Sequence, residues 1–107
     1  MNEQVKKVIN EFKRRIKVLY PGEIEQVLVF GSEARGQASP ESDVDVLVVT
    51  SFSDWKKGDA IRDVGYSLDE DIGYRLSIQV LSSAHIEYLR EHGFTFITEV
   101  ERDAIAV

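Results

Sequence analysis

The N-terminal segment carries apolar side chains at helical spacing. They stand three or four positions apart, at Val5, Val8, Ile9, Phe12, Ile16 and Leu19. This spacing places them on one face of an α-helix, with most of the lysines and arginines of the segment off that face. The Pro21-Gly22 pair is expected to end the helix.

Three later stretches have the pattern of β-strands. Residues 24–30 end in the unbroken apolar run Val27-Leu28-Val29-Phe30, which is typical of a short strand buried on both faces. Residues 43–50 are rich in β-branched side chains and predict a second strand. Residues 74–81 alternate and predict a third strand with one more polar face. Between the first two strands, residues 32–36 have room only for a short helical turn.

Helical patterns separate and follow these strands. A helix is expected from Ser53 or Asp54, either of which can cap it, to Leu68. Ser83 is expected to cap another helix, which runs through Arg90 or Glu91. After Gly93, a last short helix is expected over residues 94–101, before an extended tail at residues 104–107.

The order of the elements predicts an α/β fold, in which a small mixed β-sheet is flanked by helices. We expect a single domain over residues 1–107, because a chain of this length forms one hydrophobic core. A hydrophobic fraction of 43% and a charged fraction of 30% are ordinary for a globular protein and argue against a disordered chain.

Charge and residue usage narrow the function classes. A net charge of −6 repels a phosphate backbone, so nucleic acid is not the expected main partner. The sequence contains no cysteine, which fits a reducing compartment. It has no signal-peptide pattern and no apolar run near the ~20 residues of a membrane span. We therefore expect a cytoplasmic protein that has no membrane partner.

The candidate chemistry lies at the ends of the first two strands. Gly31-Ser32 follows the buried strand, where a residue without a Cβ leaves room for a phosphate and the Ser32 hydroxyl offers a donor. Asp43 and Asp45 are two positions apart on the next strand, so they project from one face with a rise of about 6.6 Å. Their hard carboxylate oxygens suit Mg²⁺ or Mn²⁺.

In these residues the sequence resembles the polymerase β-like nucleotidyltransferase superfamily, and within it the minimal nucleotidyltransferase (MNT) domains that pair with HEPN-domain proteins. The resemblance covers the chain from Val27 to its end. It implies the polymerase β-like fold, with ATP or another nucleoside triphosphate bound by its phosphates at Gly31 and Ser32. It also implies Mg²⁺ at Asp43 and Asp45 as catalytic carboxylates, and attack of an acceptor hydroxyl on the α-phosphate with release of pyrophosphate.

Arg35 follows the Gly31-Ser32 turn closely. Its guanidinium matches phosphate geometry and is a candidate to neutralise charge that develops on the phosphates. The alternative is a tether that holds the loop to Asp43 or Glu41.

The sequence departs from the superfamily at one position. Many members carry a third carboxylate on the next strand, and the best-matched position here is Gln79, an amide that is a weak metal ligand and no base. Three outcomes follow: a slower enzyme that uses two carboxylates, a third acid from elsewhere, or a domain that binds nucleotide without chemistry. The candidates for a third acid are Asp69, Glu70, Asp71, Glu99 and a residue of a partner. We favour the slower enzyme.

The resemblance therefore predicts a Mg²⁺-dependent nucleotidyltransferase that transfers AMP from ATP to a hydroxyl of a partner protein, as the antitoxin of a HEPN/MNT toxin–antitoxin pair. One alternative is an enzyme that modifies a small molecule of the aminoglycoside type. Another is a catalytically weak or inactive nucleotide-binding module that neutralises its partner by binding. A homo-oligomer is compatible with each of these.

Overall fold

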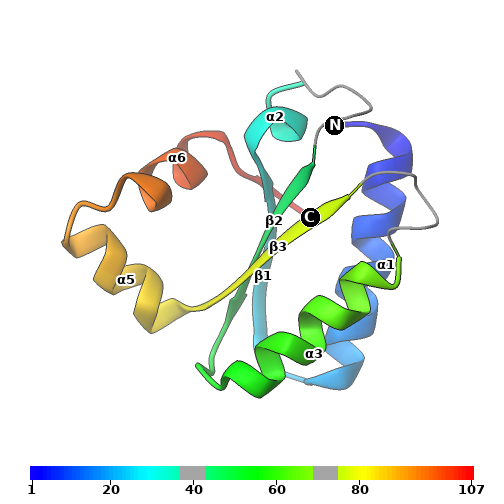
Figure 1. Cartoon of the computed structure of the whole chain (residues 1–107), viewed down its shortest axis with the longest axis horizontal. Helices are drawn as coiled ribbons and strands as arrows, with labels where there is room; N and C mark the ends of the chain where they lie inside the picture. The colour runs from blue at the N-terminus through cyan, green and yellow to red at the C-terminus, as the bar shows by residue number, and fades with distance from the viewer. Residues whose placement is uncertain (37–42, 69–74) are drawn as a thin grey trace.

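A computed structural model describes residues 1–36, 43–68 and 75–107. It shows a four-stranded sheet in the order β3-β2-β1-β4, with helices on both faces (Figure 1). The strands are β1 (Ile24–Phe30), β2 (Val44–Thr50), β3 (Leu76–Ser82) and β4 (Ile105–Ala106); the helices are α1 (Glu3–Leu19), α2 (Gly31–Ala34), α3 (Trp55–Tyr66), α5 (Ser83–Glu91) and α6 (Thr95–Asp103). The predicted α/β class with a small mixed sheet is confirmed.

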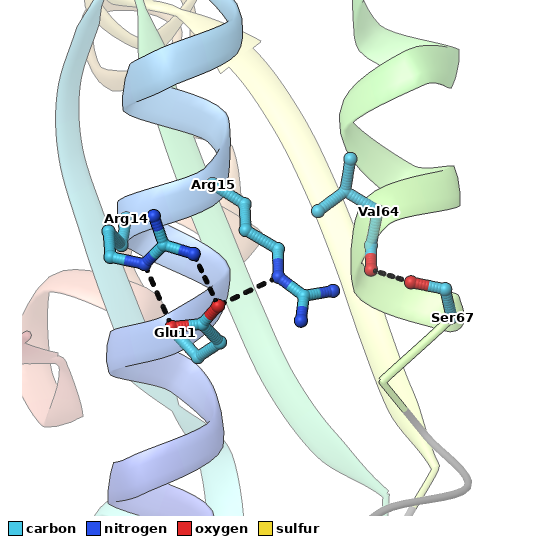
Figure 2. A network of polar contacts seen from close by, with 5 residues as sticks. All are labelled: Glu11, Arg14, Arg15, Val64 and Ser67. Carbon is cyan, nitrogen blue, oxygen red and sulfur yellow. Dashed lines mark hydrogen bonds and ion pairs between the residues drawn. The ribbon is translucent and has the colours of Figure 1, made fainter.

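Helix α1 forms as its spacing predicts. The side chain of Asn2 caps it by accepting hydrogen bonds from the backbone N–H groups of Gln4 and Val5. Four of its apolar side chains are fully buried against the sheet: Val5, Ile9, Phe12 and Ile16. On its outer side, the guanidiniums of Arg14 and Arg15 both donate to Glu11 and lower the pKa of Glu11 to about 2 (Figure 2). Exposed pairs of this kind contribute little to stability.

The sheet is mixed. Strand β1 pairs antiparallel with β2 on one side and with β4 on the other, and β2 pairs parallel with β3. Helix α3 makes the crossover between β2 and β3, and its last turn ends where the Ser67 hydroxyl donates to the carbonyl oxygen of Val64 (Figure 2). Among the described helices, none is long and apolar enough to cross a bilayer.

Two hydrophobic clusters cover the two faces of the sheet. Helices α1 and α3 pack on the larger cluster, which includes Val44, Val46 and Val48 of β2. Helices α5 and α6 pack on the smaller one, which includes Leu47 and Val49 of the same strand. The alternation of β2 therefore sends successive side chains to opposite layers.

Several predicted boundaries differ in the structure, among them the end of α3, which is Tyr66 rather than Leu68. The helix cap at the end of β3 is Ser82 rather than Ser83, since the Ser82 hydroxyl accepts from the backbone N–H of His85 at 3.1 Å. The last helix runs two residues further than expected, to Asp103. The tail is extended, as expected, but it also pairs with β1 as strand β4, an interaction that the sequence did not predict. The predicted helix end at residues 69–73 and Tyr74 lie outside the described residues.

Candidate active site

The turn between β1 and α2 requires a glycine for two reasons. Gly31 has a positive φ of 72°, a conformation that side chains disfavour. A Cβ at this position would lie 2.4 Å from Oδ2 of Asp45, because β1 and β2 pair Phe30 with Asp45. The absence of a side chain at Gly31 thus lets the Asp45 carboxylate lie directly against the turn.

The turn is fixed from behind by Glu33. This side chain is 4% exposed, and its Oε1 accepts the backbone N–H of Asn2 at 2.7 Å. The backbone N–H of Arg35 donates to the Gly31 carbonyl oxygen at 3.2 Å and closes the helical turn. The short turn after the first strand was predicted, whereas its link to the start of α1 through Glu33 was not.

An open cleft of about 520 Å³ lies in front of the turn. It is lined by Phe30, Gly31, Ser32, Arg35, Asp45, Phe96, Glu99, Val100, Arg102 and Asp103. Four of the predicted site residues, Gly31, Ser32, Arg35 and Asp45, therefore share one cleft. The opposite wall is helix α6, of which the sequence analysis had named only Glu99 as a candidate site residue.

Arg35 is held by an ion pair with that wall. Its Nη1 lies 3.0 Å from Oδ2 of Asp103, and Nη2 of Arg102 lies 3.1 Å from the same oxygen. Hydrogen bonds from Arg102 and Arg35 lower the pKa of Asp103. Arg35 thus lines the cleft and ties the turn to α6, while its role toward phosphates stays a prediction. The partner Asp103 was not foreseen, and Glu41 lies outside the described residues.

Burial and charge act together on Asp45. Its pKa is raised first by burial and then by the negative charge of Asp43, and the positive charge of Arg35 opposes the rise in part. A bound cation would relieve both unfavourable effects. Asp45 is therefore a carboxylate whose ionised form is compensated only in part by the protein itself.

Asp43 is the other predicted metal ligand. It precedes β2, is exposed, and lines a neighbouring hollow of about 340 Å³ together with Tyr66, Arg75, Leu76 and Ser77. Its charge is felt by Asp45, so the two groups are electrostatically coupled. A shared metal ion between Asp43 and Asp45 stays a prediction.

The match of Gln79 to the third carboxylate position stays a prediction. In the parallel pair β2–β3, Asp45 lies beside Ser77, and Gln79 lies beside Leu47, two residues further along the strand. The register is set by the backbone N–H of Val44, which donates to the Arg75 carbonyl oxygen at 2.8 Å. The residue next to Asp45 is a hydroxyl, so β3 still supplies no carboxylate at this level.

Of the other candidate acids, Glu99 lines the cleft, whereas Asp69, Glu70 and Asp71 lie outside the described residues. Within residues 1–36, 43–68 and 75–107, no three His, Cys, Asp or Glu side chains are grouped to hold a metal ion. The donors present fit Mg²⁺, which binds through one or two carboxylates and completes its shell with water and substrate phosphates.

The comparisons with known proteins agree with this geometry. Together they place this chain in the class of nucleotidyltransferases. The chain belongs to the family described as "Nucleotidyltransferase domain", whose model matches residues 5–102. A crystal structure of a "putative nucleotidyltransferase" from Sulfolobus solfataricus has the same fold, with a TM-score of 0.59 at 19% identity over 96% of this chain and 80% of the other.

Curated relatives come from Methanocaldococcus jannaschii. "Putative protein adenylyltransferase MJ0141" is 31% identical over 97% of this chain and 99% of its own length. "Putative protein adenylyltransferase MJ0435" is 32% identical over 72% of this chain and 82% of its own length. "Putative protein adenylyltransferase MJ0604" is 47% identical over a shorter match, which spans 46% of this chain and 47% of that protein.

Proposed function

We propose that this protein is a Mg²⁺-dependent adenylyltransferase that transfers AMP from ATP to a hydroxyl of a partner protein. The observation that carries the proposal is the contact of the Asp45 carboxylate with the Gly31 turn, inside a cleft that also contains Ser32 and Arg35. The names of the curated relatives support the choice of a protein acceptor. ATP is the proposed donor for the same reason.

Four of the cleft residues have a role in this proposal. The Gly31-Ser32 turn and Arg35 bind the β- and γ-phosphates, so that pyrophosphate is positioned as the leaving group. Asp45, together with Asp43, would hold Mg²⁺ (or Mn²⁺), which supplies charge stabilisation at the α-phosphate when bound. The acceptor hydroxyl attacks the α-phosphorus in line, the bond to the bridging oxygen of the β-phosphate breaks, and the hydroxyl proton is lost to water.

The proposed partner is a HEPN-domain protein, with this chain as the antitoxin of the pair in the cytoplasm. The resemblance of the Gly-Ser and Asp-x-Asp residues to MNT domains supports this pairing. A surface with a net charge of −6 would also favour a basic partner.

The direct test is incubation of the purified chain with labelled ATP, Mg²⁺ and the product of its neighbouring gene, the candidate partner. Label on the partner that is lost in Asp45→Asn and retained in Asp63→Asn, an exposed aspartate of α3, is the expected result. Mg²⁺ removal by a chelator should abolish the label as well. Absence of label from the partner under all conditions would overturn the proposal.

A second candidate function is neutralisation of the partner by binding alone. It is favoured by one observation: β3 carries no carboxylate, and the residues beside Asp45 and Leu47 are Ser77 and Gln79. In that case a complex forms without label, and Asp45→Asn binds the partner as tightly as the natural chain does.

A further inference from the structure

Helix α6 carries two cleft residues that the proposed chemistry has not used. Arg102 is in its last turn, and Phe96 is in its first. Both line the same cleft as Gly31, Ser32 and Asp45. The two residues are six positions apart, which corresponds to about 9 Å along a helix. This separation is comparable to the distance between the base and the phosphates of an extended nucleotide.

We propose that α6 is the nucleotide-recognition wall of the cleft, in which Arg102 binds the phosphates beside Arg35 and Phe96 stacks on the base. This inference deepens the proposed function and rests on it, since it assigns the same cleft to a nucleoside triphosphate.

The phosphate end is built by the three-residue ion cluster of Arg35, Asp103 and Arg102. Two guanidiniums of like charge lie within 3.1 Å of one carboxylate oxygen, and that oxygen holds them side by side. The Asp103 side chain is 13% exposed, whereas the Arg35 and Arg102 side chains are 40% and 66% exposed. Asp103 and Glu99 offset part of the positive charge, and the more exposed guanidinium, that of Arg102, is the one that we assign to the phosphates.

The base end is built by an aromatic pair. The rings of Phe30 and Phe96 meet edge to face, with centroids 5.9 Å apart and planes at 85°. This contact holds the Phe96 ring on one side, and Phe96 remains 36% exposed where it lines the cleft. Stacking on such a ring is tolerant of base identity, because every base has a π-face. We therefore expect ATP and GTP to bind with affinities within about threefold of each other.

The test measures binding of three probes by calorimetry in Mg²⁺: inorganic tripolyphosphate, AMP and ATP. Arg102→Ala should weaken tripolyphosphate and ATP about tenfold, and AMP much less. Phe96→Leu, which keeps the apolar volume but not the ring, should weaken AMP and ATP about tenfold and leave tripolyphosphate unchanged.

Arg14→Ala is the matched control for Arg102. Arg14 is 64% exposed and pairs with an acid of its own helix, Glu11, on the far side of the sheet from α6. It should leave all three affinities unchanged. Thermal unfolding of each variant establishes that the protein is folded.

The outcomes separate this inference from the proposed function. If the natural chain binds ATP and Asp45→Asn abolishes transfer, but Arg102→Ala and Phe96→Leu bind all probes normally, the role of α6 is wrong and the adenylyltransferase stands. If only Arg102→Ala loses affinity, the assignment of Phe96 to the base is wrong. If only Phe96→Leu loses affinity, the assignment of Arg102 to the phosphates is wrong. If the natural chain binds neither ATP nor tripolyphosphate, the proposed function fails, and the inference fails with it.

Discussion

The two faces of strand β2 are built from alternate residues of one seven-residue segment, yet they differ in how completely their side chains are buried. On the face toward α1 and α3, Val44, Val46 and Val48 are all 0% exposed. On the face toward α5 and α6, Leu47 and Val49 are nearly as buried, but the series begins with Asp45 at the open cleft. The same strand therefore contributes only buried apolar side chains to one face, the closed face of Val44, Val46 and Val48. On the other, the open face of Asp45, Leu47 and Val49, it presents a partly buried carboxylate.

The closed face should carry most of the stability, and the largest effect is expected there. Phe12 of α1 is fully buried, and its Cε1 lies 3.2 Å from where a Cβ on Gly65 of α3 would be. Phe12→Ala removes a ring from between two helices and should lower the free energy of unfolding by about 3–5 kcal/mol. Urea denaturation measures this loss.

Val18→Ala is the control, because Val18 belongs to the same helix and is 70% exposed. It should change the free energy of unfolding by no more than about 0.5 kcal/mol. Equal losses in the two variants would show that the closed face is not the stabilising one.

On the open face, we expect a substitution that lowers activity to raise stability. Asp45→Asn should reduce AMP transfer at least about a hundredfold, because it removes the carboxylate that touches the Gly31 turn. The same change should raise the thermal midpoint of the metal-free protein. The pKa of Asp45 is raised in the folded state, so its ionisation on going to higher pH opposes folding.

The stability difference between Asp45→Asn and the natural chain should accordingly be small at low pH, where Asp45 is protonated in both states. It should grow as the pH passes through the raised pKa of the folded protein and stay constant above it. Thermal unfolding over this pH range measures the difference. A variant that is less stable than the natural chain at neutral pH would contradict the electrostatic account of the site.

The sequence predicted most elements because their periodicity is local. The spacing from Val5 to Ile16 and the apolar run to Phe30 each define an element without long-range information. The convergence of Gly31 with Asp45 was also accessible, since a glycine at a strand end and an Asp-x-Asp at the next strand form a known combination. These predictions depend on residues close in the sequence.

The missed features depend on contacts between distant residues. Arg35 and Asp103 are 68 positions apart, and no local pattern in α6 distinguishes Arg102 or Asp103 from residues of a solvated helix end. The register that places Ser77 beside Asp45 is fixed by backbone hydrogen bonds between β2 and β3, which α3 separates in the sequence, and a parallel pair has no hairpin turn from which it could be predicted. Strand β4 is only two residues long and has no strand pattern of its own.

Two glycines test whether ATP binding at the open face requires the close approach of the Asp45 carboxylate to Gly31, or only the left-handed backbone of the glycine. Gly31 and Gly36 both have a φ of 72°, but a Cβ on Gly36 would meet nothing within 4 Å. Each alanine variant should lose about 1–2 kcal/mol of stability from the left-handed backbone. Gly31→Ala should also lose ATP binding, because its Cβ must displace the Asp45 carboxylate. Calorimetry with ATP separates the two effects, and equal binding by the two variants would refute a role for close approach.

The smallest expected effect concerns the edge of the open face, where the register places Ser77 beside Asp45 and Gln79 beside Leu47. Ser77→Asp adds a third carboxylate next to the existing pair, so it should tighten Mn²⁺ binding by about tenfold, since affinity rises with the charge of the ligand set. Gln79→Asp, which adds the same charge to the same strand, should change the affinity less than about twofold, because its carboxylate begins some 6.6 Å further along.

In the metal-free protein, Ser77→Asp should also lower the thermal midpoint, because another negative charge beside Asp45 raises the cost of ionising that group. Calorimetric titration with Mn²⁺ and thermal unfolding in chelator measure the two quantities. Tighter binding by Gln79→Asp than by Ser77→Asp would place the cation two residues further along the strand, away from the Gly31 turn, and would separate the metal from the cleft on which the open face depends.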